Sequence, residues 1–409
     1  MPIRADRLAR DIAAIAAQPL STGANRPTFS PAWVAARNYV IAQAQQFGCL
    51  VLIDPAGNVH IRQVSNGFRN QPVWLSGSHL DSVPNGGDFD GVLGVVAPLE
   101  VLRAAHEDGV KNLPLELVIF AEEEGTTFGL GMLGSRAWAG TLSVDQLGKV
   151  RNAQGENYLQ AGERWGVRPN EITADGFRPS DYAGMIELHI EQGPAMWNRG
   201  QPVAVVSAIN GRRQYRAEIR GVANHAGSTS MTDRRDALAG AAEMMTYLEG
   251  LMPTLSPRAV ATVGQIQCWP SAVNVIPEKA VFAIDFRAPD NEVLARGDAQ
   301  IRERFAALVA RRGLSGSLDA SEALPAVPLD PRICERLSQT ANRLGHGTLP
   351  ETTSGALHDA AILAPFLPTA MLFVASKDGI SHNPAEFSRM EDIALATEIL
   401  YEAVKTPFV

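Results

Sequence analysis

The sequence SGSHLDSVPNGGDFDG, residues 76–91, lies between an apolar run and a segment with apolar residues at helical spacing. It predicts a loop at the carboxyl end of a buried strand, where open α/β sheets usually place their sites. His79 offers an imidazole nitrogen, and Asp81 can accept the proton of the other ring nitrogen. Asp90 can give one oxygen to each of two metals. The stretch therefore predicts half of a metal site, with a polar surface turn as the alternative.

A second cluster of acidic residues follows the apolar run at residues 115–120. Glu122, Glu123 and Glu124 stand where a buried strand ends, and buried carboxylates need cations. If the chain stayed extended, Glu123 and Glu124 would point to opposite sides, one toward a metal and one toward a substrate. The alternative is a solvated run of charges.

A third polar stretch interrupts the apolar strand predicted at residues 185–190. Alternation puts three polar side chains on one face of this strand and Gln192 at its exit, the three being Glu187, His189 and Glu191. This stripe favours a site over a structural role for the histidine.

Further histidines occur in turns near the C-terminus. His358 stands beside Asp359, and His382 follows a buried strand predicted at residues 368–375. His60, in a predicted hairpin without acidic sequence neighbours, is expected to be structural.

Composition bounds the class of protein. The chain has 409 residues, is 45% apolar and 20% charged, and carries a net charge of −8, as in a soluble protein of two domains. That charge disfavours nucleic acid and anionic membranes as partners. Three cysteines far apart predict neither a disulfide framework nor a thiolate site. Residues 1–17 predict an amphipathic helix and not a signal peptide, and no run is long enough to span a membrane, so we expect a cytoplasmic enzyme.

Residues 211–325 differ from the rest of the sequence in the order of their predicted strands and helices. Strand and helix patterns there follow a βαββαβ-like order, which predicts a small α+β domain inserted into a first domain of residues 1–210 and 326–409. The patterns are strands at 215–219 and 281–287 and helices at 234–251 and 291–312. The inserted part also holds His225, Asn274 and Arg287, and taken alone each reads as a turn or a strand end.

The motifs GSHLDSVPNGGDFDG, EEEG, ELHIEQGP, NHAGST, SGALHDA and GISHNP occur in this order. From about residue 20 to the C-terminus the chain resembles the hydantoinase/carbamoylase branch of the M20 family of di-zinc amidohydrolases. The resemblance implies an α/β fold with a zinc-aminopeptidase-like catalytic domain. The inserted α+β domain would be a ferredoxin-like lid that mediates a homodimer and closes by hinges near residues 210 and 326.

The resemblance also implies two divalent metal ions. His79, Asp90 and His189 would bind one ion, and Asp90, Glu124 and His382 the other, with Asp90 bridging. Nitrogen and oxygen ligands suit Zn²⁺, with Mn²⁺, Co²⁺ or Ni²⁺ as replacements.

Catalytic and substrate-binding roles follow from the same resemblance. A metal-bridging hydroxide would be the nucleophile, with Glu123 as general base. Asp81 and His225 would assist, His225 from its own subunit or from a partner's. The implied substrate-binding residues are Gln192, His225, Asn274, Arg287 and His358. Arg287 suits a substrate carboxylate, because its planar fork forms bidentate pairs.

The predicted reaction is hydrolysis of a carbon–nitrogen bond in an N-carbamoyl (ureido) amino acid, with release of ammonia. Alternatives are an allantoate amidohydrolase, an M20 N-acyl-amino-acid amidohydrolase or peptidase, and a catalytically inactive binding protein. Three departures from the branch leave the substrate and its stereochemistry open. Thr127 replaces a frequent arginine, Leu357 a glycine and Ser230 a proline.

Overall fold

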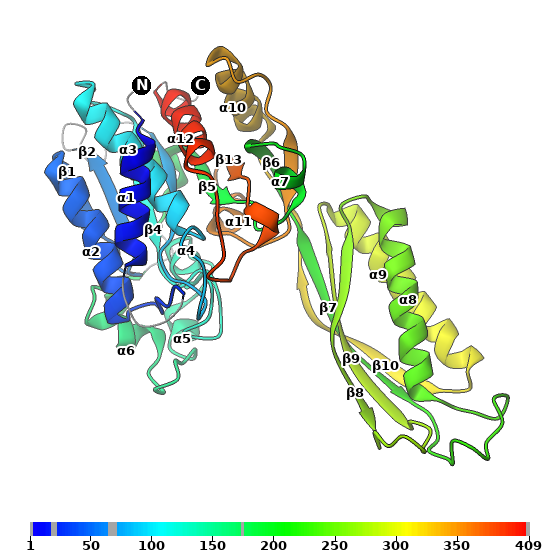
Figure 1. The fold of residues 1–409 in the computed structure, drawn as a ribbon. Helices are drawn as coiled ribbons and strands as arrows, with labels where there is room; N and C mark the ends of the chain where they lie inside the picture. Colours follow the sequence, from blue (N-terminus) through cyan, green and yellow to red (C-terminus); the bar gives the residue numbers. More distant parts are fainter. Residues whose placement is uncertain (1–2, 18–22, 64–71, 173–175, 406–409) are drawn as a thin grey trace. The chain divides into compact units, whose positions relative to one another are not determined.

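The computed structural model describes residues 3–17, 23–63, 72–172 and 176–405. The first two residues of the predicted N-terminal helix lie outside this part. The chain divides into two compact units (Figure 1). The first unit comprises Met1–Ser207, Leu329–Thr352 and Leu357–Val409, and the second comprises Ala208–Pro328 and Thr353–Ala356.

The first unit is built on a mixed sheet with the order β1-β2-β4-β3-β5-β13-β6-β11, and β12 pairs with β6. The four neighbours β4, β3, β5 and β13 run parallel, and their side chains form almost continuous buried runs. The strands are β1 Cys49–Ile53, β2 Val59–Gln63, β3 Val73–His79, β4 Leu115–Phe120, β5 Tyr182–Ile190, β6 Val203–Ile209, β11 Val327–Pro328, β12 Glu351–Ser354 and β13 Thr369–Val374. Of these, β11 and the last two residues of β6 and of β12 fall within the second unit.

Five long helices of the first unit form one connected layer, in which α1 and α3 contact each other and both contact α2 and α12, while α10 contacts α12. Within this layer, α3 and α12 also pack against the parallel strands. These five are α1 Ala5–Ala16, α2 Pro31–Gln46, α3 Val92–Glu107, α10 Pro331–Arg343 and α12 Met390–Val404. Shorter helices include α4 and α11, which contact each other, while α11 also contacts β5 and β13. The shorter helices are α4 Leu133–Trp138, α5 Val144–Leu147, α6 Tyr158–Glu163, α7 Ala195–Asn198 and α11 Asp359–Leu363.

The second unit has a four-stranded antiparallel sheet of order β10-β7-β9-β8, with α8 and α9 side by side (Figure 1). Alternate residues of β9 are buried, as expected for a sheet covered on one face. The unit has its own apolar core. Its elements are β7 Gly211–Arg220, α8 Ala237–Leu255, β8 Val260–Trp269, β9 Lys279–Ala288, α9 Asn291–Arg311 and β10 Ser315–Leu324.

Sequence patterns found two strands of this unit and missed two. β8 and β10 are mostly exposed along their length, so they lack the apolar alternation that marks a half-buried strand. They are sheet strands because β9 and β7 supply hydrogen-bonding partners.

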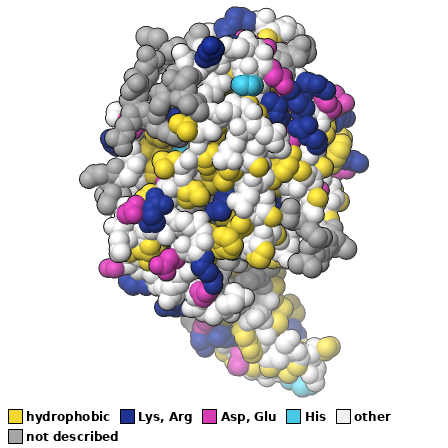
Figure 2. All heavy atoms as spheres, turned by 90° about the vertical axis from the view of Figure 1, so that its left-hand side faces the viewer, with side chains coloured by type: hydrophobic (Ala, Val, Ile, Leu, Met, Phe, Trp, Pro, Cys, Tyr) yellow, Lys and Arg dark blue, Asp and Glu magenta, His cyan; other side chains and the backbone are white. Residues whose placement is uncertain are grey.

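The surface carries both signs of charge. On the face drawn in Figure 2, Lys and Arg side chains lie beside Asp and Glu side chains. Among the described residues, none of the helices combines the length and hydrophobicity that crossing a membrane requires.

Candidate metal centre

Four adjacent parallel strands deliver the candidate ligands to one edge of the sheet. His79 is the last residue of β3, and His189 is the penultimate residue of β5. The acidic residues follow β4, and His382 follows β13. Because the carboxyl ends of parallel strands meet at one edge, residues more than 300 positions apart in sequence come together there.

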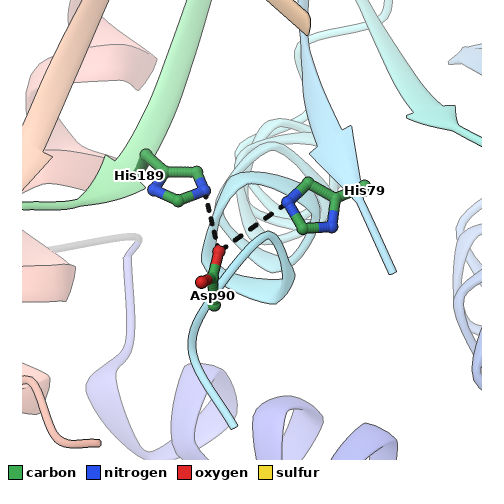
Figure 3. Close-up of side chains that lie close together, drawn as sticks. All are labelled: His79, Asp90 and His189. Atoms are coloured by element: carbon green, nitrogen blue, oxygen red, sulfur yellow. Dashed lines mark ion pairs between the residues drawn. The ribbon is translucent and has the colours of Figure 1, made fainter. Parts of the chain in front are cut away.

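Asp90 lies at the centre of this cluster. Its Oδ1 atom is 3.2 Å from His189 Nε2 and 3.7 Å from His79 Nε2 (Figure 3). All three side chains are buried. The potential ligand atoms of these residues lie within 4.8 Å of one another, a spacing that a single metal ion can bridge.

The other carboxylate oxygen of Asp90 belongs to a second group. His382 Nε2 lies 3.2 Å from Asp90 Oδ2 and 3.5 Å from Glu124 Oε2. These three residues also have ligand atoms within 4.8 Å of one another. Asp90 is thus shared by two groups of potential ligands, one through each oxygen.

The loop that carries Asp90 approaches His79 very closely. Gly91 has φ +68°, and a Cβ atom there would lie 2.4–2.6 Å from the His79 ring. Only glycine meets both conditions, so Gly91 allows the turn from Asp90 into α3 to pass over the imidazole.

The predicted contact between His79 and the Asp81 carboxylate is replaced by a main-chain contact. His79 Nδ1 lies 3.0 Å from the Asp81 carbonyl oxygen and 3.9 Å from the nearer carboxylate oxygen. The Asp81 carboxylate instead accepts hydrogen bonds from the backbone N–H groups of Glu123, at 3.3 Å, and Glu124, at 3.1 Å. Asp81 therefore links the histidine to the acidic segment.

The predicted alternation of the acidic residues is wrong. β4 ends at Phe120, and Glu122 has φ +58°, so the chain is not extended through this segment. Glu123 and Glu124 both face the cluster, with Glu123 Oε2 3.6 Å from His79 Nε2. Buried Glu122 has a structural contact, since its Oε1 accepts 2.9 Å hydrogen bonds from the backbone N–H groups of Thr127 and Phe128.

Burial and crowding of like charges shift the pKa values here. Burial lowers the pKa of His79 to about 4, so its imidazole is neutral and free to bind a metal. Burial also opposes the charge on His189, but Asp90, with smaller contributions from Glu187 and the Ile190 carbonyl, raises the pKa of that imidazole to about 9. The pKa of Glu123 is raised well above its ordinary value, first by burial and then by the charge of Glu124.

Two residues without a recognisable sequence pattern fix Asp90. Glu386 Oε1 accepts hydrogen bonds from the backbone N–H groups of Phe89, at 2.9 Å, and Asp90, at 3.0 Å. Ser381 Oγ lies 2.9 Å from Glu386 Oε2 and 3.1 Å from Asp90 Oδ2. A single acid and a single serine in a loop give no periodicity, so only spatial proximity identifies them.

Two predicted substrate-binding residues lie against the cluster. Gln192 Nε2 donates to Asp90 Oδ2 over 2.7 Å. The buried His358 ring packs edge-on to His189, with 4.5 Å between ring centroids. Burial, followed by the charge of His189, lowers the pKa of His358 well below its ordinary value, so this imidazole is neutral.

The remaining predicted site residues belong to the second unit. His225 and Asn274 are brought together there, since Ala226 N–H donates to the Asn274 carbonyl over 3.0 Å and His225 forms a bridge with Val275. Arg287, on β9, donates through Nε to Asp285 over 2.8 Å and through Nη1 to the Gly355 carbonyl over 2.8 Å. Their roles stay predictions.

Thr127, Leu357 and Ser230, the three residues that differ from the branch pattern, lie in different parts of the structure. Thr127 Oγ1 accepts a 3.0 Å hydrogen bond from Thr28 N–H, and Leu357 is partly exposed directly before buried His358. Ser230 lies exposed in the second unit, where its hydroxyl donates to Asp233 over 2.6 Å.

His60 is structural, but it has acidic partners that the sequence did not reveal. Its Nδ1 lies 2.7 Å from Glu116, on the neighbouring strand β4, and its Nε2 lies 3.3 Å from Asp54. Burial opposes the charged form, yet Glu116 and Asp54 raise the pKa of His60 to about 9.

Comparison with known proteins decides the family. The model of peptidase family M20/M25/M40 matches residues 75–406. The chain belongs to that family. This M20 protein is 37% identical to an N-carbamoyl-L-amino acid amidohydrolase of Geobacillus stearothermophilus, over 94% of this chain and 93% of the relative. It is 32% identical to an allantoate amidohydrolase of Escherichia coli, over 94% of this chain and 91% of the relative.

A solved structure agrees with this assignment. The amidase of the hydantoinase/carbamoylase family from Burkholderia multivorans superposes with a TM-score of 0.92 at 34% identity, covering 98% of this chain and 97% of that one. The predicted α/β fold of the M20 type is therefore confirmed.

The residues of this M20 protein fit divalent metal ions. Asp81, Asp90, Glu123 and Glu124 meet in a largely buried region, and burial raises the pKa values of all but Asp90. Buried carboxylates keep their charge only where cations offset it, so this cluster suits a cation. The donors in the two Asp90 groups are imidazole nitrogens and carboxylate oxygens, a set that suits Zn²⁺.

Proposed function

We propose that this chain hydrolyses N-carbamoyl (ureido) amino acids, releasing ammonia, carbon dioxide and the free amino acid. The observation that carries the proposal is the sharing of Asp90 between two triads of potential ligands at one sheet edge. The similarity to an N-carbamoyl-L-amino acid amidohydrolase supports the choice of substrate.

Two divalent metal ions, with Zn²⁺ the best match to the donors, are the cofactors of this proposal. His79, Asp90 and His189 would hold one ion, and Asp90, Glu124 and His382 the other. When bound, such ions polarise the scissile carbonyl and make a water molecule acidic.

Glu123 is the general base of the proposed reaction. Its side chain is 11% exposed and lies beside His79, so it borders the cluster without belonging to either triad around Asp90. A general base works best when its pKa lies near the working pH, and burial together with Glu124 shifts the pKa of Glu123 upward, in that direction. Glu123 takes a proton from the attacking water and returns it to the leaving nitrogen.

Gln192 and His358 complete the first unit's share of the proposed site. Gln192 binds Asp90, which limits the orientation of both side chains. His358 is neutral, so it can donate a hydrogen bond to a substrate oxygen without adding its own positive charge to that of the metal ions.

The second unit supplies His225, Asn274 and Arg287 in this proposal. Arg287 would bind the substrate carboxylate, and His225 and Asn274 would stabilise negative charge on the attacked carbonyl oxygen. These roles, the lid movement and the homodimer rest on the family resemblance.

Measuring ammonia release by metal-loaded protein tests the proposal. The substrates are a panel of N-carbamoyl-L-amino acids, N-carbamoyl-β-alanine and allantoate, and N-acetyl amino acids are assayed for amine release. Release from an N-carbamoyl-L-amino acid supports the proposal. Turnover of allantoate alone would support the alternative suggested by the Escherichia coli relative, and cleavage of N-acetyl compounds alone would refute a ureido substrate.

A further inference from the structure

The segment of residues 23–28 contacts the loop that carries His79 and Asp90. Ala24 and Gly86 exchange two backbone hydrogen bonds, each 2.9 Å long. Two residues further on, Arg26 N–H donates to Ser82 Oγ over 3.0 Å, and Ser82 N–H donates to the Arg26 carbonyl over 3.3 Å. The segment is therefore attached at two points to the loop between two candidate ligands.

The same segment touches the loops of the other candidate ligands. Thr28 N–H donates to Thr127 Oγ1 over 3.0 Å, in the loop that follows Glu124. Gly23 lies against the loop after His382, since a Cβ atom at Gly23 would be 2.6 Å from Pro384 Cγ and 2.8 Å from the Gly86 carbonyl oxygen. Six residues thus contact three of the four loops that carry the cluster.

Arg26 is the centre of this segment and is only 1% exposed. Its Nε donates to the Leu80 carbonyl over 2.8 Å, while its Nη2 has no hydrogen-bond partner among the described residues. The charges that act on its guanidinium are carboxylates around the cluster, namely Asp88, Asp81, Glu386 and Asp90. Burying a charge without a paired carboxylate opposes folding, so stability alone does not account for Arg26.

We propose that residues 23–28 form a positioning strap that holds the ligand loops at metal-binding distances, with Arg26 as its main positioning residue. The strap lies outside residues 75–406, the part that matches the family model. Arg26 acts through the backbone of residues 80–82, next to His79, and its charge offsets repulsion among the carboxylates. The inference rests on the proposed function insofar as the cluster binds metal.

The test measures zinc affinity by competition with a chromophoric chelator, independently of turnover. Arg26→Met removes the Nε donor and the charge at similar length, and we expect zinc affinity to fall about 10–100-fold, as for other residues that orient metal ligands. Arg37→Met is the matched control, because Arg37 is also buried but lies on α2 and donates to the Trp165 carbonyl over 3.0 Å. The control should keep wild-type affinity.

Two further variants separate positioning from charge and from folding. Gly23→Ala keeps every charge but forces apart Pro384 and Gly86, so it should also weaken zinc binding. Arg26→Lys keeps the charge, and its zinc affinity should lie between those of wild type and Arg26→Met. Thermal unfolding of the metal-free variants shows whether any loss of affinity merely reflects loss of folded protein.

The outcomes distinguish this inference from the proposed function. If Arg26→Met and Gly23→Ala bind zinc as tightly as wild type, or Arg26→Met binds it more tightly, the strap does not position the ligands. If wild type itself binds no divalent metal, both the strap and the proposed function fail. If wild type binds metal but turns over no ureido acid, only the proposed function fails.

Discussion

Asp90 shows how one side chain sets the chemistry of a whole site. One of its oxygens faces His79 and His189, and the other faces His382, Gln192 and Ser381. The backbone of Asp90 is held in turn by Glu386. A carboxylate whose two oxygens face opposite groups of ligands is suited to bridging two cations.

Replacing Glu123 with Gln tests the proposed base. The amide cannot accept a proton from water, so ammonia release should fall at least about 100-fold, within the range typical of general acid–base catalysis. Metal content, measured by elemental analysis, should stay at the wild-type level because Glu123 belongs to neither triad around Asp90. Glu163→Gln, on the exposed end of α6, is the control and should be fully active. Turnover near wild type in Glu123→Gln would assign the base elsewhere.

Protons on three candidate ligands predict how metal affinity depends on pH. Burial opposes the charge on His189, but Asp90 and Glu187 raise its pKa to about 9, and Asp90 raises the pKa of His382 to about 9, so both rings are charged at pH 7 in the metal-free protein. Burial, followed by the charge of Asp90, raises the pKa of Glu124 to about 8, so this carboxyl group is also largely protonated at pH 7. A metal requires neutral imidazoles and an ionised carboxylate, so loading should release protons, and affinity should rise as the pH rises through about 8 to about 9. Calorimetric titration in buffers of different ionisation enthalpy measures that release. Binding without proton release at pH 7 would contradict this charge assignment.

The strands β2 and β4 carry a separate buried ionic group around His60. Glu116 also accepts a 3.0 Å hydrogen bond from the Tyr182 hydroxyl and pairs with Arg62. None of these residues belongs to the candidate ligand groups, so the titration of His60 reports on the packing of β2 against β4.

We expect His60 to stay protonated at neutral pH and to titrate near pH 9. A raised pKa means that the stabilisation is complete below the ordinary value of 6.5 and is lost as the pH rises through about 9. Histidine NMR spectra, with the His60 resonance identified by its absence in His60→Gln, measure this directly. The thermal stability advantage of wild type over His60→Gln should shrink from pH 6.5 to 9. A His60 resonance that titrates below pH 7 would contradict the ion pairing.

Sequence patterns identified the elements with strong apolar periodicity. The strand predicted at residues 115–120 is β4, and the helix predicted from residue 92 is α3. The prediction that the chain stays extended after β4 was wrong, because Glu122 has a positive φ angle. Hydrophobic periodicity gives no information about the φ angle of a single residue. The partners of His60 were missed for a related reason, since Glu116 meets it across a strand pair.

The two units have separate apolar cores, so metal binding should affect them unequally. All candidate ligands belong to the first unit. Metal at about 1,000 times its dissociation constant stabilises the folded state that binds it by about 4 kcal/mol. We therefore expect calorimetry to show one metal-dependent transition and one that does not move when a chelator removes the metal. A fragment of residues 208–328, which contains the whole apolar core of the second unit, identifies the invariant transition. A shift of both transitions by equal amounts would refute this independence.

The sequence by itself determined the family, the order of the main elements and the residue types of the metal centre. It could do so because ligand chemistry and apolar periodicity are local properties of the chain. The tertiary structure decided how those residues meet. It placed Asp90 between two groups, turned both Glu123 and Glu124 toward them, and brought Glu386 and Arg26 against loops far away in sequence. Such contacts depend on strand order and loop packing, which no single stretch of sequence encodes.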